Sequence, residues 1–340
     1  MKNFNFGSFP TTRPRRLRQS QWIRDLVAEN KIVTDDLILP LFVIEGKNKQ
    51  EKITALPDVF RFSTDLIVKK AREAKSLGIN ALMLFPAIDQ KLKNSQGSEA
   101  WNENNLICRT IKAIKDAVPE IGIIADVALD PYTSHGHDGI IDKNGYVVND
   151  ETIEALCKQA LVQAEAGCDI VAPSDMMDGR IAVIRDSLDE CGLVNTAIMS
   201  YAAKYASSFY GPFRNAVGSA ANLGKTEKKS SVKKDKKTYQ MDFRNSLEAT
   251  KEISLDISEG ADLLIIKPGM PYLDIIKATK DNISLPIVAY QVSGEYAMLK
   301  FAAANGAFDF DEVFYESLVA FKRAGSDAII TYGAIEIAKK

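Results

Sequence analysis

Lysines at the ends of apolar stretches are the side chains in this sequence best placed for covalent chemistry. Residues 263–274 read LLIIKPGMPYLD, so four apolar residues lead into Lys267 and Pro268-Gly269 ends the run. Such a run predicts a strand buried on both faces, as in parallel sheets. A lysine at its end loses hydration, which lowers its pKa and frees a nucleophilic amine. A lysine that extends into solvent is the commoner alternative.

A second lysine ends another expected strand. Residues 199–204 read MSYAAK and finish in Lys204. If the two strands are neighbours, the amines of Lys204 and Lys267 lie within a few ångströms, and each positive charge disfavours charge on the other. At least one amine would then be neutral near pH 7 and ready to condense with a ketone. This pairing favours a catalytic role for Lys267 over a solvated one.

The elements that must position these lysines alternate between strand and helix along the 340 residues. Several expected helices are closed by glycine. Alternation over this length favours a parallel sheet, and eight strands favour a closed TIM (β/α)8 barrel of the α/β class. Chemistry in such barrels lies at the carboxyl ends of the strands. The expected strands are 37–44, 81–85, 122–129, 170–172, 197–201, 263–266, 286–292 and 328–331.

Acidic residues and both histidines of the chain follow the third expected strand. Asp126 ends it, and residues 130–139 read DPYTSHGHDG. These side chains include ligands for a divalent cation, although the glycines and turn residues also describe an ordinary ordered loop. We prefer an acid–base or substrate-orienting role for Asp126 and Asp130.

A long connection follows the fifth expected strand, at about residues 209–246, and seven lysines lie between positions 225 and 237. A loop of this length in a compact domain is usually a lid or disordered. A solvated basic flap is the plain alternative. We prefer a lid whose Arg214 or lysines close over a substrate that carries a carboxylate.

Composition narrows the class of protein. A net charge of −2 argues against a general nucleic-acid or membrane-surface partner, and no apolar run approaches the roughly 18 residues of a membrane helix. The first ten residues lack the apolar core of a signal peptide, and the four cysteines show no CxxC spacing, so we expect a cytoplasmic protein. Residues 1–25 are predicted to be an oligomerisation arm, anchored by Phe4, Phe6 and Phe9, and residues 26–340 the catalytic barrel.

Several motifs together resemble those of the porphobilinogen synthase (5-aminolevulinate dehydratase) family, over nearly the whole chain. The resemblance implies a TIM barrel that condenses two molecules of 5-aminolevulinate into porphobilinogen, with release of two waters, in tetrapyrrole (heme) biosynthesis. It also implies a homo-octamer built of dimers. The motifs are MSYAAK at 199–204, FYGPFR at 209–214, IKPG at 266–269, VSGEY at 292–296, DPYTSHGHDG at 130–139 and the arginine-rich arm.

The resemblance also implies roles for individual residues. Lys267 would form a Schiff base with one substrate, and Lys204 would form one with the other substrate or polarise it. Arg214, helped by a lid lysine that aligns with Lys236, would grip one substrate carboxylate. The other carboxylate would be held by Ser293 and Tyr332. The match to Lys236 stays open, because the lid lysine could equally be one of its neighbours Lys233, Lys234 and Lys237.

Metal use is the main departure from part of that family. Its zinc-dependent members carry three cysteines where this chain has Ala128, Asp130 and Asp138, so the resemblance implies no catalytic zinc. It implies instead the aspartate-rich type that responds to an allosteric Mg²⁺ bound away from the active site. The matching ligand is Glu252, with Asp175 as an outer-shell partner through water.

Two other functions fit parts of the sequence. A class I aldolase is also a barrel with a Schiff-base lysine, but it needs only one lysine and usually a glycine-rich phosphate site after strands 7 and 8. Here those strands end in Ser293-Gly294-Glu295 and Tyr332-Gly333, a poor phosphate site. A catalytically inactive scaffold is the second rival. The presence of both lysines and Arg214 argues against it.

Overall fold

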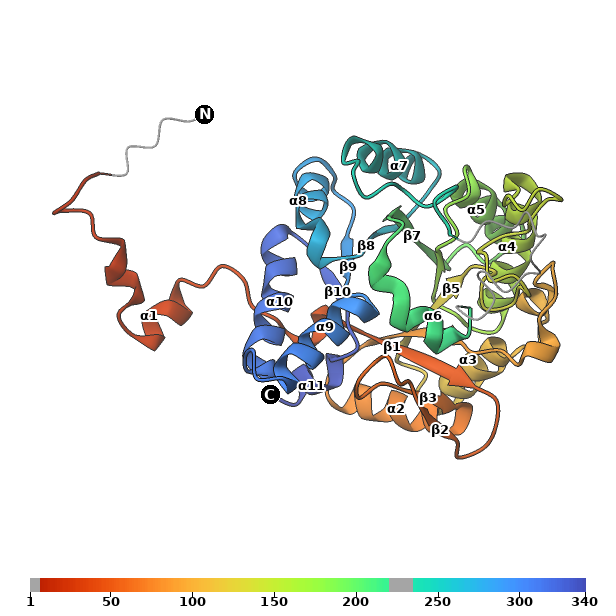
Figure 1. Cartoon of the computed structure of the whole chain (residues 1–340), viewed down its shortest axis with the longest axis horizontal. Helices are drawn as coiled ribbons and strands as arrows, with labels where there is room; N and C mark the ends of the chain where they lie inside the picture. The colour runs from red at the N-terminus through yellow and green to blue at the C-terminus, as the bar shows by residue number, and fades with distance from the viewer. Residues whose placement is uncertain (1–6, 220–234) are drawn as a thin grey trace.

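The computed structural model describes residues 7–219 and 235–340, and its centre is a closed barrel of eight parallel strands (Figure 1). Neighbouring strands pair in chain order, and β10 pairs with β1 to close the ring. The fold class predicted from the sequence is thereby confirmed. The barrel strands are β1 (Leu37–Ile44), β4 (Ala81–Pro86), β5 (Gly122–Val127), β6 (Ile170–Pro173), β7 (Ala197–Lys204), β8 (Leu263–Lys267), β9 (Ile287–Tyr290) and β10 (Ala328–Ile330).

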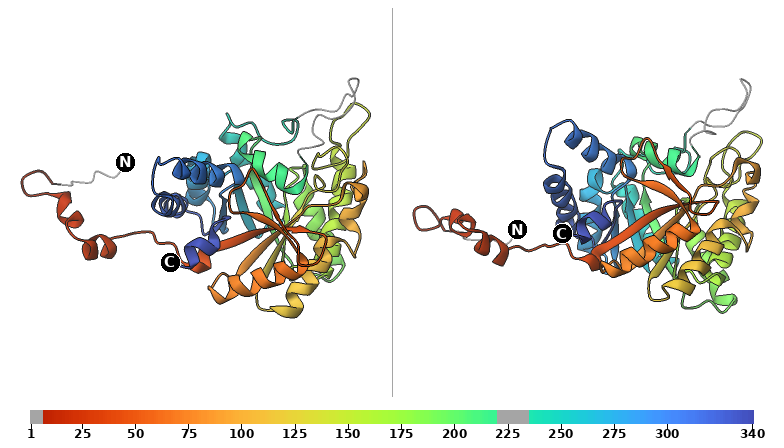
Figure 2. Two further views of the ribbon diagram at one scale, coloured as in Figure 1. Left: turned by 60° about the horizontal axis from the view of Figure 1, so that its bottom comes forward. Right: turned by 90° about the horizontal axis from the view of Figure 1, so that it is seen from below.

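Helices surround the barrel, and each strand from β4 to β8 is followed by a helix that leads to the next strand (Figures 1 and 2). Two helices, α9 and α10, lie between β9 and β10. The short helix α6 follows β7 and carries Arg214. The helices are α2 (Thr64–Ser76), α3 (Leu106–Ala117), α4 (Asn149–Glu165), α5 (Arg180–Glu190), α6 (Gly211–Val217), α7 (Leu247–Ser258), α8 (Leu273–Asn282), α9 (Ser293–Ala304), α10 (Phe310–Ala324) and α11 (Ala334–Ala338).

The structure adds a strand pair that the sequence did not predict. β2 (Gln50–Lys52) and β3 (Phe60–Ser63) form an antiparallel pair, and β3 pairs in parallel with the end of β1. β2 is three polar residues, mostly exposed, and β3 is only four residues long, too short for its Phe60/Phe62 alternation to stand out as a strand. Strand β7 also runs beyond the predicted 197–201, because a bulge between Ser200 and Ala203 lets pairing with β8 continue to Lys204.

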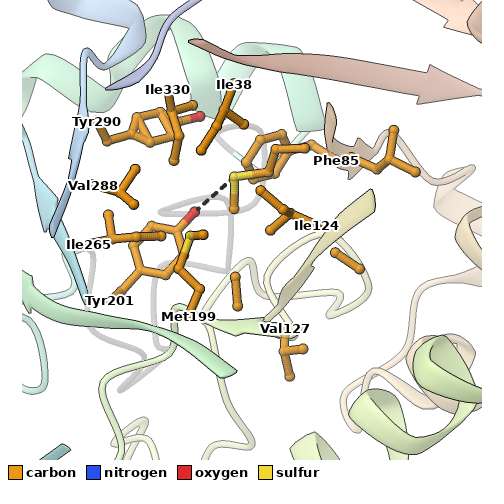
Figure 3. Packing of buried hydrophobic residues seen from close by; sticks show 14 of the residues in the cluster. Ile38, Phe85, Ile124, Val127, Met199, Tyr201, Ile265, Val288, Tyr290 and Ile330 are labelled. Atoms are coloured by element: carbon orange, nitrogen blue, oxygen red, sulfur yellow. Dashed lines mark hydrogen bonds between the residues drawn. The ribbon is translucent and has the colours of Figure 1, made fainter. Parts of the chain in front are cut away.

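Large side chains fill the inside of the barrel (Figure 3). Tyr201, Tyr290 and Ile265 point inward from consecutive strands β7, β9 and β8 and are fully buried. The Tyr201 hydroxyl lies 3.8 Å from the sulfur of Met83. Burial of one such side chain contributes about 1.5–3 kcal/mol, so the packed interior stabilises the barrel and leaves its mouth for the functional groups.

The N-terminal segment extends away from the barrel (Figures 1 and 2). Its described part contains the 3₁₀ helix η1 (Pro14–Arg18) and the helix α1 (Gln21–Leu26), neither of which has a buried residue. Trp22 and Leu26 are 67% and 73% exposed. The anchors Phe4 and Phe6 lie outside the described residues, and Phe9 is exposed beneath the guanidinium of Arg13. None of the helices in residues 7–219 and 235–340 is long and apolar enough to span a membrane.

Candidate active site

The structure brings the two predicted lysines together at the mouth of the barrel. Lys204 is the last residue of β7 and Lys267 the last residue of β8, and their Cα atoms are partners in the strand register. Adjacent strands lie about 4.8 Å apart, so both amines emerge side by side. Both side chains are almost completely buried.

Aromatic rings surround the Lys267 amine. Its Nζ atom lies 4.5 Å from the ring centre of Tyr290, 4.9 Å from Tyr201, 5.0 Å from Phe213 and 5.3 Å from Tyr210. Burial, together with the positive charge of Lys204, lowers the pKa of Lys267 to about 7, although nearby aspartates oppose the shift. The Lys267 amine is therefore available as a neutral nucleophile near neutral pH.

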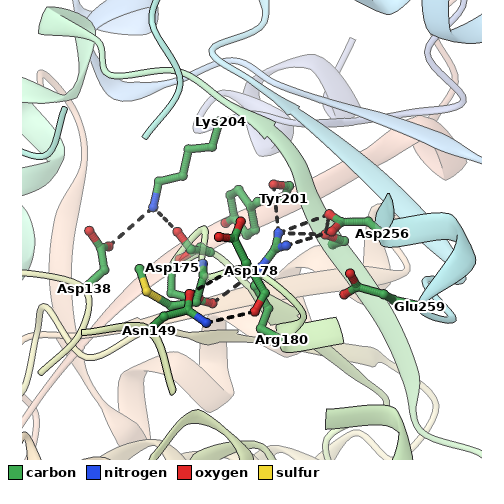
Figure 4. Close-up of polar contacts among 12 residues, drawn as sticks. Asp138, Asn149, Asp175, Asp178, Arg180, Tyr201, Lys204, Asp256 and Glu259 are labelled. Carbon is green, nitrogen blue, oxygen red and sulfur yellow. Dashed lines mark hydrogen bonds and ion pairs between the residues drawn. The ribbon is translucent and has the colours of Figure 1, made fainter. Parts of the chain in front are cut away.

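The Lys204 amine lies in polar surroundings instead (Figure 4). Its Nζ atom donates a hydrogen bond to the backbone oxygen of Ser174 and lies 3.4 Å from Oδ1 of Asp138. The two lysines thus differ in character, since aromatic faces surround Lys267 while a carbonyl and a carboxylate hold Lys204. Such a difference lets the two amines take separate roles in one reaction.

Asp126, near the end of β5, lines the inner site together with both lysines. Burial raises the pKa of Asp126 to about 6, while Lys267 and Lys204 act in the opposite direction. Among the described residues, its Oδ1 atom has no hydrogen-bond partner. A carboxyl with this pKa can both hold and release a proton near neutral pH.

Lys236 comes from the connection between α6 and α7 and lies at the other side of the site. Its Nζ atom lies 2.9 Å from Oδ2 of Asp138 and 3.3 Å from Oδ2 of Asp130. Burial by itself would lower the pKa of Lys236, but Asp130 and Asp138 outweigh that effect and raise it. Lys236 is therefore a buried, paired cation. Lys233 and Lys234, its rivals in the sequence, lie outside the described residues, and Lys237 is exposed.

The other residues predicted to bind the substrate carboxylates lie around this cluster. Arg214 lies on α6 and lines both the inner site and an outer cavity of about 500 Å³. The Ser293 hydroxyl, at the start of α9, accepts a 2.9 Å hydrogen bond from the backbone N–H of Phe213. The Tyr332 hydroxyl lies 3.3 Å from that of Tyr290. Ser293 therefore contacts the segment that carries Arg214, and Tyr332 contacts the ring cage of Lys267.

The inner site itself is nearly full. Its free volume is about 20 Å³, enough for about one water molecule. The ion pairs of Lys236 and Lys204 with Asp138 occupy the space. Any substrate must displace these contacts, and the outer cavity beside Arg214 gives access to them.

The predicted magnesium ligand Glu252 lies outside the lysine site, whereas Asp175 directly follows Ser174, whose backbone oxygen accepts a hydrogen bond from Lys204. Glu252, on α7, lines a polar cavity of about 370 Å³ together with Glu248 and Asp178. Burial raises the pKa of Glu252, and Asp178 and Glu248 add to the effect. In the described part of the chain, no three His, Cys, Asp or Glu side chains group tightly enough to hold a metal ion. A hydrated Mg²⁺ needs only one or two carboxylates, so Glu252 and its neighbours fit such an ion.

Asp175 is fully buried (Figure 4), and Met176 and Met177, which follow it in the chain, line that cavity. Its Oδ1 atom accepts a 2.7 Å hydrogen bond from the N–H of Met177, and Oδ2 lies 3.9 Å from Nε of Arg180. Burial raises the pKa of Asp175 to about 6, against the effect of Arg180. Arg180 in turn forms an ion pair of 2.7 Å with Asp256.

Both histidines belong to the ordered loop after β5. The N–H of His137 donates to Nδ1 of His135, whose Nε2 atom contacts the oxygen of Ser95 at 3.2 Å. Burial lowers the pKa of His135 to about 4, so this ring is neutral. These contacts fit the ordered-loop interpretation better than a metal site.

The sequence did not predict a role in the site for three residues, namely Ser174, Gln240 and Tyr239. Ser174 provides only a backbone oxygen, for which no side-chain pattern exists. Gln240 is buried between the inner and outer cavities, and Tyr239 contacts Asp138, yet neither stands out in a lysine-rich segment. Their position just after Lys236 was the available signal.

Comparisons with known proteins agree over nearly the whole chain. A model of the family described as "Delta-aminolevulinic acid dehydratase" matches residues 11–340. The chain is 56% identical over 328 residues to the delta-aminolevulinic acid dehydratase of Bradyrhizobium diazoefficiens, covering 96% of this chain and 90% of that protein. It is 48% identical to the same-named protein of Rhodobacter capsulatus, with 97% of each chain covered.

A solved structure is also closely similar. The crystal structure of delta-aminolevulinic acid dehydratase from Toxoplasma gondii ME49, in complex with the reaction product porphobilinogen, superposes with a TM-score of 0.92. The sequences are 49% identical, and the match covers 96% of this chain and 91% of that one.

Proposed function

This chain belongs to the delta-aminolevulinic acid dehydratase family, and from that premise we propose how its residues join two molecules of 5-aminolevulinate into porphobilinogen. The enzyme is a lyase, and the reaction forms one carbon–carbon and one carbon–nitrogen bond between the substrates while two waters leave. The product serves heme biosynthesis.

The register pairing of Lys204 with Lys267 carries this proposal. Each substrate has a ketone, and a neutral amine that attacks a ketone takes up one proton to give an iminium ion and one water. The positive nitrogen makes the neighbouring carbon acidic, so bonds can form at neutral pH. Lys267, with its pKa of about 7, is the Schiff-base nucleophile, and Lys204 forms a second Schiff base or polarises the other ketone.

Asp126 and Asp130 are proposed to move protons and to stabilise iminium charge. The pKa of Asp126, raised to about 6 by burial, suits it to accept a proton from a substrate carbon and return it to a leaving oxygen. Asp130 pairs with Lys236 and lies on the loop that follows Asp126. Both carboxyls line the inner site together with the two lysines.

The substrate carboxylates are assigned to two pairs of residues. Arg214 and Lys236 would bind one carboxylate, which replaces the aspartates that Lys236 contacts in the nearly full site. Ser293 and Tyr332 would bind the other. The guanidinium of Arg214 suits bidentate binding of a carboxylate, and α6 carries it at the mouth of the outer cavity.

We also propose that the enzyme responds to Mg²⁺ and uses no catalytic zinc. Glu252 would hold the ion with bound waters, and Asp175 would act as an outer-shell partner. When bound, the ion offsets repulsion among the carboxylates of that cavity. The absence of cysteine at Ala128, Asp130 and Asp138 supports an aspartate-rich type without a thiolate zinc site.

A homo-oligomer, an octamer built of dimers, is the proposed assembly. The exposed apolar side chains of the arm, such as Trp22 and Leu26, support contact with another subunit. Deletion of residues 1–25 should reduce the mass of the particle in solution, and an unchanged mass would count against the arm. A cytoplasmic location stays a prediction.

Trapping of the Schiff bases tests the proposed reaction. Borohydride reduction in the presence of 5-aminolevulinate, followed by peptide mass spectrometry, should give adducts on Lys267 and, if the second Schiff base forms, on Lys204. Porphobilinogen formation is measured in parallel. Absence of any adduct would favour the scaffold alternative, and an adduct only with a sugar phosphate would favour an aldolase.

A further inference from the structure

Tyr239 and His137 form a hydrogen-bonded pair behind Asp138 that the proposed reaction does not yet use. The Tyr239 hydroxyl donates a 2.8 Å hydrogen bond to Oδ2 of Asp138 and accepts one of 3.3 Å from its backbone N–H. Nδ1 of His137 lies 3.1 Å from the same hydroxyl. One phenol thus contacts both the carboxylate and the backbone of Asp138, although it lies 101 residues away in the chain.

These contacts determine where the protons lie. A tyrosine hydroxyl has one hydrogen to donate, and here a carboxylate takes it. Nδ1 of His137 therefore carries a hydrogen and donates it to the phenol oxygen. The loop around His137 is itself held, because Thr133 donates a 2.9 Å hydrogen bond to the His137 oxygen. The pair is consequently a rigid support for the carboxylate of Asp138.

The Asp138 carboxylate contacts two lysines of the site, Lys204 and Lys236. Its Oδ1 atom faces Lys204 at 3.4 Å, and its Oδ2 atom faces Lys236 at 2.9 Å. Lys204, Lys236 and the Tyr239 hydroxyl together hold the pKa of Asp138 well below its usual range, in spite of its burial. Asp138 is therefore a fixed negative charge beside Lys204.

The same segment supplies Lys236 and Tyr239. The N–H groups of Tyr239 and Gln240 donate to the Lys236 oxygen at 3.3 and 2.9 Å, so one tight turn presents all three side chains. When a substrate carboxylate takes Lys236 from Asp138, the Oδ2 atom loses its cation. The Tyr239 hydroxyl then remains as its partner.

We propose that Tyr239, supported by His137, is a positioning residue that keeps the Asp138 carboxylate directed at Lys204 once Lys236 has turned to the substrate. This inference rests on the proposed function, in which Lys204 engages a ketone and Lys236 binds a substrate carboxylate. A carboxylate rotates freely about its last torsion unless it is held. Tyr239 therefore acts on turnover through Lys204, and it has little part in substrate affinity.

Three variants and a control test the proposal on the full-length enzyme. Tyr239→Phe removes the hydroxyl and should lower kcat on the order of 10- to 100-fold, the effect of losing one hydrogen bond to a charged group, with KM within about threefold. His137→Asn keeps an N–H donor near the Nδ1 position and should retain kcat within about threefold. His137→Leu lacks the donor, and its kcat should lie between those of Tyr239→Phe and His137→Asn. Tyr205→Phe is the matched control, because its hydroxyl contacts only the oxygen of Asn245 among the described hydrogen bonds, and its activity should not change.

Borohydride trapping separates positioning from a structural role. In Tyr239→Phe, Lys204 should engage the substrate more slowly. This engagement is measured as the rate at which the Lys204 adduct forms or as the rate of product release. The adduct at Lys267 should form at the normal rate. Equal slowing at both lysines, a raised KM with normal kcat, or an unchanged kcat would each overturn the proposal. If the wild-type enzyme forms neither adduct nor product, the proposed function itself fails. Normal wild-type chemistry with an unaffected Tyr239→Phe variant defeats this inference alone.

Discussion

Lys204 and Lys267 are register partners at the ends of the neighbouring parallel strands β7 and β8. Their amines nevertheless have different surroundings, since Lys267 lies among four aromatic rings and Lys204 contacts a carbonyl and a carboxylate. Proximity lets each charge act on the other, and the different surroundings decide which amine is neutral.

The first prediction concerns the titration of Lys267. Its pKa of about 7 means that the reactive free amine increases as the pH rises through 7. Lys204→Met removes a positive charge that lowers this pKa, so the midpoint of adduct formation at Lys267 should move to higher pH. Lys204→Arg keeps the charge and serves as the control, with a midpoint near that of the wild type. The measurement is borohydride-trapped adduct at Lys267 against pH, and equal midpoints in all three proteins would refute the coupling.

Asp126→Asn should separate catalysis from stability. Loss of a proton-transfer group lowers kcat by about 10²- to 10⁴-fold. The pKa of Asp126 is raised from 3.8 to about 6 on folding, so its contribution favours the folded state at low pH and is lost as the pH rises through 6. At pH 7 the variant should therefore unfold at the same temperature as the wild type or higher. Near-normal turnover would remove Asp126 from the mechanism.

The buried ion pair of Arg180 and Asp256 is expected to be a major support of the barrel wall (Figure 4). Arg180→Met leaves the carboxylate of Asp256 buried without its cation, which should cost about 3–5 kcal/mol in the free energy of unfolding. Asp256→Asn should cost a similar amount. Lys277→Met is the comparison, because Lys277 and Asp281 form an exposed ion pair on α8 and its loss should cost less than about 1 kcal/mol. Urea unfolding of the three variants measures these differences, and similar costs for both pairs would contradict the assignment.

Arg61 should control the affinity for substrate from outside the site. Its guanidinium donates to the backbone oxygens of Ala216 and Asn215, at 2.5 and 2.6 Å, and so holds the carboxyl end of α6. Arg61→Met should release this helix and misplace Arg214, raising KM for 5-aminolevulinate about three- to tenfold. Arg109→Met, which removes an exposed arginine paired with Glu45, is the matched control. A larger fall in kcat than rise in KM would point to a different role.

Removal of Mg²⁺ tests the metal assignment. Activity should fall after treatment with EDTA and return with added Mg²⁺, and Glu252→Gln should weaken the binding of Mg²⁺ measured by calorimetry. Glu190→Gln alters an exposed carboxylate at the end of α5 and should bind Mg²⁺ as the wild type does. Unchanged Mg²⁺ binding in Glu252→Gln would exclude that residue as the ligand.

Much of the scaffold follows from the sequence, because strand and helix patterns are local. Mostly apolar runs of three to eight residues and glycines after helices predict the eight barrel strands, and this prediction is confirmed. The same patterns place Lys267 at a strand end. They also place Lys204 at the end of an expected strand, but they do not predict the bulge between Ser200 and Ala203, which depends on pairing with β8 and leaves no local signature.

What surrounds the lysines was decided only by the tertiary structure. The contact of Asp138 with Lys236 and Tyr239 joins segments about one hundred residues apart, and Arg180 meets Asp256 from another helix. Such pairs depend on how whole elements pack, so neither spacing nor composition predicts them. The sequence determines that this chain is a barrel with two lysines able to react with ketones. Only packing decides which lysine is neutral and which carboxylate faces the other, because burial and distance determine each pKa.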